Sequence, residues 1–114
     1  MDGFILGAGG GDGGGGASVE DSAQILIAKA LLRDGRHDSA KRVLRLVLAR
    51  SPDCVEALFT LGFVHDVGHE NDGVAQAMSR VVELVPEHAH AWLFKGMSES
   101  RRGDYKEAIR SFLQ

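Results

Sequence analysis

The chain has 114 residues, of which 44% are apolar and 25% are charged, with a net charge of −3. This length is enough for one small domain and excludes a two-domain enzyme, and the composition excludes a disordered or collagen-like chain. The charge balance excludes a default attraction to nucleic acid, and the single cysteine, Cys54, cannot form a disulfide within the chain. We expect a cytoplasmic protein without a membrane partner, because the sequence has neither a secretory leader nor an apolar run of about 18 residues.

Residues 1–18 form a glycine-rich segment, which we expect to be a flexible tail. Gly9, Gly11 and Gly14 match the spacing of a dinucleotide-binding loop. Such a loop requires a buried strand before it and a helix directly after it, and both are missing here, so we expect no cofactor.

The apolar part of the tail is Phe4-Ile5-Leu6. As a random coil, the stretch between this segment and Val19 reaches about 20 Å. The segment is therefore either an idle leader or a plug that enters an apolar groove of its own chain or of a neighbouring chain.

A 34-residue period runs through the remaining residues, 19–114, which we expect to form one domain of repeats. Equivalent positions hold similar residues: Ala23, Ala57 and Ala91; Ala28, Gly62 and Gly96; Leu44, Met78 and Phe112; Pro52 and Pro86. A period of this length is typical of stacked helical repeats. It predicts three repeats at about 21–54, 55–88 and 89–114, the last one incomplete.

Each repeat has the pattern of two short antiparallel helices. In the first, apolar residues at helical spacing stop before Gly35, a residue suited to a left-handed turn. Asp38 or Ser39 is expected to cap the second helix, and Pro52 ends it. The second and third repeats follow the same plan, with expected helices at 55–67 and 73–85 and a turn at Gly103. The small residues in the first helices allow the paired helices to approach closely.

The third repeat carries a family resemblance. Its pattern is Ala91-Trp92-x-x-x-Gly96, followed by Gly103-x-Tyr105-x-x-Ala108-x-x-x-Phe112. Together with the 34-residue period, it resembles the tetratricopeptide repeat (TPR) over residues 21–114. The resemblance implies an all-α, right-handed superhelix of antiparallel helix hairpins whose first helices line a concave groove.

The groove residues are then read at spacings of four along the first helix of each repeat. They are Ile25, Lys29 and Arg33; Phe59, Phe63 and Val67; Leu93, Met97 and Arg101. The large apolar members predict a groove for an apolar peptide or helix, and the basic members would set its polarity. The alternative is that the apolar members are ordinary interior packing and the basic ones are solvated rim charges.

Four histidines could form a metal site, since His65 and His69 lie one helical turn apart and two more follow at His88 and His90. No cysteine pair supports such a site, so we expect no bound metal. The sequence shows neither a Ser/His/Asp set nor a pair of carboxylates that would indicate catalysis, so we expect that the chain is not an enzyme.

The sequence therefore predicts a scaffold or adaptor module that binds a peptide or helix of a partner protein. One alternative is the recruitment segment of a larger enzyme such as a transferase, and another is an assembly or secretion chaperone that shields an apolar segment. The pattern stops within a helix at Ser111-Phe112-Leu113-Gln114. We expect Phe112 and Leu113 to lie at an exposed apolar end, covered by more chain or by a second copy.

Overall fold

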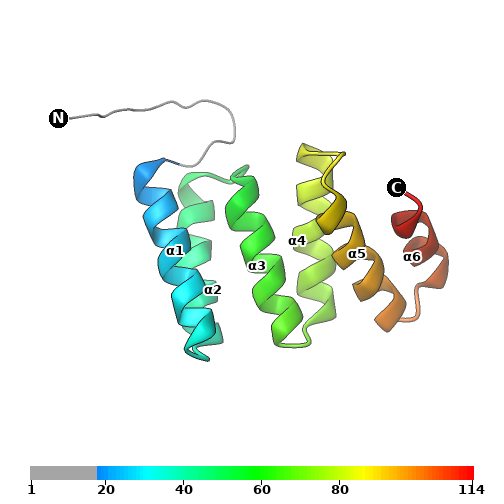
Figure 1. Ribbon diagram of the computed structural model, residues 1–114, viewed down its shortest axis with the longest axis horizontal. Helices are drawn as coiled ribbons and strands as arrows, with labels where there is room; N and C mark the ends of the chain where they lie inside the picture. Colours follow the sequence, from blue (N-terminus) through cyan, green and yellow to red (C-terminus); the bar gives the residue numbers. More distant parts are fainter. Residues whose placement is uncertain (1–17) are drawn as a thin grey trace. The chain divides into compact units, whose positions relative to one another are not determined.

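The structure, a computed structural model, describes residues 18–114. Within this range it contains six helices and no strand (Figure 1): α1 (Val19–Arg33), α2 (His37–Arg50), α3 (Val55–Val67), α4 (Asn71–Leu84), α5 (Ala89–Arg101) and α6 (Tyr105–Phe112). The expected all-α architecture of two helices per repeat is confirmed. The tail and its Phe4-Ile5-Leu6 segment lie outside the described residues.

The chain divides into two compact units, Met1–Ala57 and Leu58–Gln114. The first unit holds α1 and α2, together with the first residues of α3. The second unit holds the rest of α3 and α4, α5 and α6. The boundary thus falls inside a helix.

In the first unit, α1 packs against α2. The core positions follow the helical period: Ile25 and Ala28 on α1, and Ala40, Leu44 and Val47 on α2, all without exposed surface. Burying these apolar side chains stabilises the pair, because neither helix can cover its apolar stripe alone.

In the turn between α1 and α2, the structure confirms the predicted glycine but not the predicted helix cap. Gly35 has a φ of +81°, as expected for a left-handed turn residue. The expected cap at Asp38 or Ser39 is wrong: Arg36 precedes the first helical residue and makes no side-chain cap hydrogen bond. The Ser39 hydroxyl instead accepts a hydrogen bond of 3.2 Å from Arg42. The helix starts earlier than the cap rule predicts.

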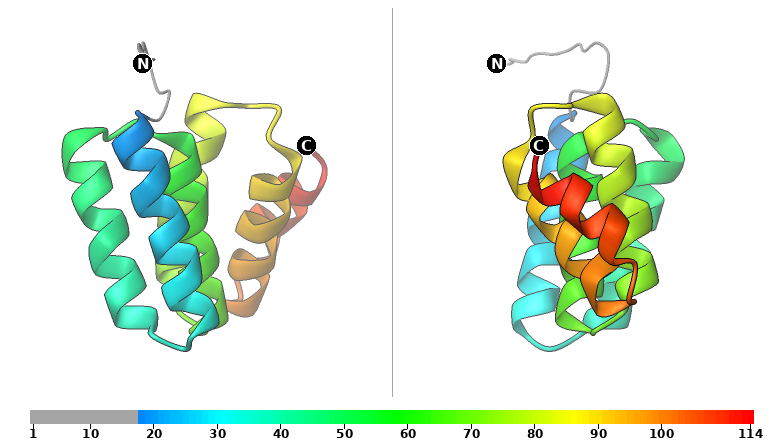
Figure 2. Two further views of the ribbon diagram at one scale, coloured as in Figure 1. Left: turned by 60° about the vertical axis from the view of Figure 1, so that its left-hand side comes forward. Right: turned by 90° about the vertical axis from the view of Figure 1, so that its right-hand side faces the viewer.

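In the second unit, two glycines allow close helix contacts. A Cβ atom on Gly62 of α3 would lie 2.6 Å from Cε of Met78 on α4. A Cβ atom on Gly96 of α5 would lie 2.5 Å from Cε1 of Phe112 on α6. These two pairs are one repeat apart, so the expected role of the small-residue column is confirmed. Figure 2 shows α6 lying along α5 as a result.

The helix α5 packs against α4 on one side and α6 on the other. The linker before α5 is held by two hydrogen bonds: Nε1 of Trp92 donates to the Pro86 carbonyl at 2.7 Å, and Nδ1 of His88 accepts from the Ala91 amide at 3.1 Å. His88 thereby caps the start of α5.

The turn between α3 and α4 contains a strained residue. His69 has a φ of +59°, whereas the equivalent positions in the other two turns are Gly35 and Gly103, with φ of +81° and +87°. A side chain in this backbone region costs energy because Cβ crowds the carbonyl oxygen.

A buried polar cluster joins α5 and α6. Nζ of Lys95 lies 2.6 Å from Oε2 of Glu99 and 3.2 Å from Oγ of Ser111. The Ser111 hydroxyl donates to Oε1 of Glu99 at 2.7 Å. The three groups satisfy one another, which allows two opposite charges to be buried.

Candidate protein-binding surface

Three predicted groove residues lie along α3, four residues apart and hence on one side of the helix. Phe63 and Val67 are both 39% exposed, and Phe59 is half-buried. The apolar side of α3 is therefore only partly covered by the second unit.

Three more lie along α5 at the same spacing. Leu93 is 47% exposed, Met97 is half-buried and Arg101 is exposed. We use the name apolar surface for the four side chains Phe63, Val67, Leu93 and Met97, which come from two helices of the same unit.

Aromatic contacts fix the two helices of this surface relative to each other. The Phe94 ring lies edge-on to Phe63, with 6.0 Å between ring centroids, and edge-on to Phe59 at 5.8 Å. The His88 ring also contacts Phe59, with 4.9 Å between ring centroids. Edge-to-face contacts of this kind contribute about 0.5–1.5 kcal/mol beyond the burial of their area. Phe94 is not among the predicted groove residues, although it shares a helix side with the buried residues Ala91 and Ser98.

One ion pair borders the apolar surface. Nη1 of Arg101 lies 2.8 Å from Oδ1 of Asp66, which connects the end of α5 to the end of α3. The Arg101 side chain is partly exposed, so its remaining N–H groups stay accessible to a carboxylate.

The other predicted groove residues lie on α1 of the first unit. Lys29 pairs with Glu56 at 3.4 Å, and Arg33 is exposed in the last turn of the helix. Ile25 has no exposed surface, so the expectation that it contacts a ligand does not fit this structure. It lies one turn from the buried Ala28, on the side of α1 that forms the core with α2.

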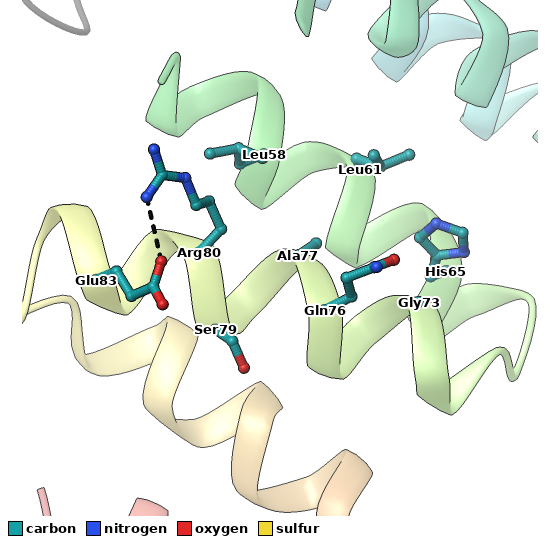
Figure 3. Close-up of a pocket in the computed structure, with 9 residues that line it drawn as sticks. All are labelled: Leu58, Leu61, His65, Gly73, Gln76, Ala77, Ser79, Arg80 and Glu83. Atoms are coloured by element: carbon teal, nitrogen blue, oxygen red, sulfur yellow. Dashed lines mark hydrogen bonds and ion pairs between the residues drawn. The ribbon is translucent and has the colours of Figure 1, made fainter. Parts of the chain in front are cut away.

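A pocket of about 450 Å³ lies on a different side of α3 and α4 (Figure 3). Its lining residues are Leu58, Leu61 and His65 from α3 and Gly73, Gln76, Ala77, Ser79, Arg80 and Glu83 from α4. Figure 3 shows two leucines over one side and the Arg80 and Glu83 pair, 3.1 Å apart, at one end. None of the predicted groove residues lines this pocket, and no motif in the sequence indicates it.

The histidine His65 makes local contacts. Nδ1 of His65 lies 2.8 Å from Oε1 of Glu70, and a Cβ atom on Gly73 would collide with the His65 ring. Within residues 18–114, no three His, Cys, Asp or Glu side chains gather as a metal site would require. In the same part of the chain, no helix combines the length and apolarity needed to cross a membrane.

Comparison with known proteins identifies the family of these repeats. Residues 21–64 and residues 72–114 each match a family model described as the tetratricopeptide repeat. The crystal structure of MamA is similar, with a TM-score of 0.76 and 22% sequence identity, covering 80% of this chain and 53% of that chain. This chain thus spans about half the length of the MamA chain, and the likeness shows a TPR-like helical repeat fold. A comparison with curated protein sequences gave no match.

Proposed function

The chain belongs to the tetratricopeptide repeat family, whose repeats serve as protein interaction modules, and we propose that it binds an apolar peptide or helix of a partner protein. The binding site is the apolar surface of the second unit. We further propose that the role is non-catalytic, with the partner held rather than transformed.

One observation carries this proposal: α3 and α5, which are held together by the Phe94 contacts, each expose large apolar side chains. Phe63 exposes 39% of its surface and Leu93 exposes 47%. Burying apolar side chains of this size would stabilise the protein, so leaving them in contact with water has a free-energy cost. Grouped exposed apolar residues on a folded protein mark interaction sites. Met97, one turn after Leu93 on α5, is flexible and polarisable, which suits an apolar partner of irregular shape.

The aromatic contacts around Phe94 support the same conclusion. Because Phe94 holds both Phe59 and Phe63, the exposed Phe63 ring is positioned before a ligand arrives. A preorganised side chain loses less conformational entropy on binding. Arg101 at the border offers a charge-assisted contact, so the preferred ligand carries an acidic residue next to its apolar residues.

A peptide selection on the purified chain tests the proposal. A library of helical and extended peptides is displayed, selected peptides are synthesised, and their binding is measured by titration calorimetry and by NMR shifts of the second-unit amides. Phe63→Ala and Leu93→Ala should each weaken binding by about tenfold, as expected for central apolar contacts.

Leu46→Ala is the matched control, because Leu46 is an exposed leucine on α2 outside the apolar surface. It should bind as the wild type does. Selected peptides whose NMR shifts map away from Phe63 and Leu93, or whose affinity ignores both substitutions, would overturn the proposal.

A further inference from the structure

The first and last helices each carry an apolar side that is uncovered among the described residues. The α1 outer face consists of Val19, Ala23, Leu26 and Ala30, all exposed. The α6 outer face consists of Tyr105 and Ile109, together with Leu113 directly after the helix, also all exposed. Leu26 and Ile109, near the middle of each face, are 64% and 58% exposed.

The repeat shows what normally covers the α1 outer face. Adding 68 residues gives its counterparts on α5, and there Ala91 and Ser98 are fully buried and Phe94 is half-buried. They lie on the side of α5 opposite Gly96, which faces α6, so the earlier helices of the second unit cover them. The same side is covered on α5 and uncovered on α1.

The α6 outer face has counterparts 34 residues earlier on α4. Ala75 there is buried, whereas its counterpart Ile109 on α6 is exposed. Because α4 packs against α5, the α4 counterparts belong to a helix with neighbours on both sides (Figure 1). On α6, only the side toward α5 is covered.

We propose that copies of this chain associate head to tail, with the α6 outer face of one copy packed on the α1 outer face of the next. The arrangement repeats the one that α4 has on α5 within the second unit. The side-chain volumes are compatible with this packing. On α6, Ile109 is larger than its counterpart Ala75, and on α1, Leu26 is smaller than its counterpart Phe94, so the two differences offset each other in a close-packed contact.

Charge supports a second copy as the occupant. In the second unit, Nη1 of Arg102 pairs with Oδ1 of Asp72 at 3.0 Å, and this pair connects α5 to α4. The repeat places Asp34 where Arg102 stands and Lys106 where Asp72 stands. Both charges are exchanged, so Lys106 of one copy would meet Asp34 of the next as an opposite-charge pair. Both residues are exposed, and Asp34 also pairs with Arg36 of its own chain at 3.0 Å.

This association is distinct from the proposed peptide binding, because it uses neither Phe63 nor Leu93. A head-to-tail contact does not close on itself unless the rotation forms a ring, so it extends to chains of several copies. Such an assembly would present the apolar surface repeatedly and bind a multivalent partner with avidity.

The test is the oligomeric state of the 114-residue chain, measured by sedimentation velocity and light scattering from micromolar to millimolar concentration. The wild type should form larger species as concentration rises. Leu26→Asp and Ile109→Asp should each weaken association by about tenfold or more, since each buries a charge in an apolar contact. Circular dichroism confirms that the variants remain folded.

Mixing the two variants gives the sharper result. Leu26→Asp keeps an intact α6 outer face and Ile109→Asp keeps an intact α1 outer face, so the mixture should form one-to-one dimers and nothing larger. Leu46→Asp, a matched control on α2, and Leu93→Asp on the apolar surface should both associate as the wild type does.

Charge exchange tests the pairing without placing a charge in an apolar contact. Lys106→Glu and Asp34→Lys should each weaken association, and the double variant should restore it. A wild type that stays monomeric at millimolar concentration, a Leu26→Asp variant that associates normally, or a mixture that forms no dimer would overturn the proposal. The second of these outcomes would indicate contact between two α6 faces instead.

Discussion

The α1–α2 and α5–α6 pairs occupy equivalent places in the repeat, 68 residues apart, yet different chemistry holds them together. In the α5–α6 pair, a polar cluster of Lys95, Glu99 and Ser111 lies between the helices. The equivalent residues of the α1–α2 pair are apolar: Ile27, Leu31 and Val43. One helix-pair geometry thus accepts either an apolar or a polar seam, provided that every polar group in the seam has a partner.

The α1–α2 pair has a polar contact of its own, at its ends. Arg50 donates to Oδ1 of Asp21 at 2.7 Å and also to Gln24, and the Ser51 hydroxyl donates to Oδ2 of Asp21 at 2.8 Å. The Arg50 hydrogen bond is the main cause that lowers the pKa of Asp21 below its ordinary value. The position equivalent to Asp21 on α5 is Ala89, which cannot make this contact. Polar contacts are therefore local additions to a shared apolar frame.

The largest expected effect comes from breaking the seam of the α5–α6 pair. Lys95→Met should lower the free energy of unfolding by about 3 kcal/mol, because it leaves the buried Glu99 carboxylate without its cation. The measurement is urea denaturation followed by circular dichroism. Arg110→Met is the control: it removes an exposed pair with Glu107 and should cost less than about 0.5 kcal/mol.

Copying the apolar seam should reverse that loss. The triple variant Lys95→Ile, Glu99→Leu and Ser111→Val carries the residues of the α1–α2 pair, and its stability should return to within about 1 kcal/mol of the wild type or exceed it. A triple variant as unstable as Lys95→Met would show that the polar seam is specific to the α5–α6 geometry.

A smaller effect is expected at the ends of the α1–α2 pair. Asp21→Asn should cost about 1–2 kcal/mol at neutral pH, because the charge-assisted hydrogen bonds to Asp21 become neutral ones. Since folding lowers the pKa of Asp21, its contribution is present above the ordinary pKa of about 3.9 and is lost as pH falls through the lower folded value. Melting temperatures of the wild type and Asp21→Asn should therefore converge below about pH 4. Asp38→Asn, on the exposed side of α2, should leave the profile unchanged.

The smallest effect concerns the turn that lacks a glycine. His69→Gly should raise stability by about 0.5–1 kcal/mol, because glycine removes the left-handed strain and loses only part of that gain to its more flexible unfolded chain. Gly35→Ala is the mirror test and should lower stability by a similar amount, since a Cβ there meets no atom within 4 Å and only the backbone is strained. A melting temperature that falls in His69→Gly would contradict this account.

Much of the fold follows from the periodic pattern. The 34-residue spacing predicts the six helices, and the column containing Gly62 and Gly96 predicts where helices approach closely. The cap at Asp38 or Ser39 was wrong because the helix begins earlier, at His37, without a side-chain cap. The polar seam was missed because Lys95 and Glu99 become compatible with burial only through Ser111 on the facing helix, a contact that sequence spacing does not reveal.

For the candidate site, the sequence selected the helix side and the tertiary structure decided what is accessible. Ile25, Phe59 and Leu93 occupy one column of the repeat, and the sequence treats them alike. The structure buries Ile25 completely, half-buries Phe59 and leaves Leu93 47% exposed. A period fixes the direction of a side chain around its helix, because that direction depends only on backbone geometry. Exposure depends on which neighbours pack there, and neighbours distant in sequence are brought together only by the folded chain.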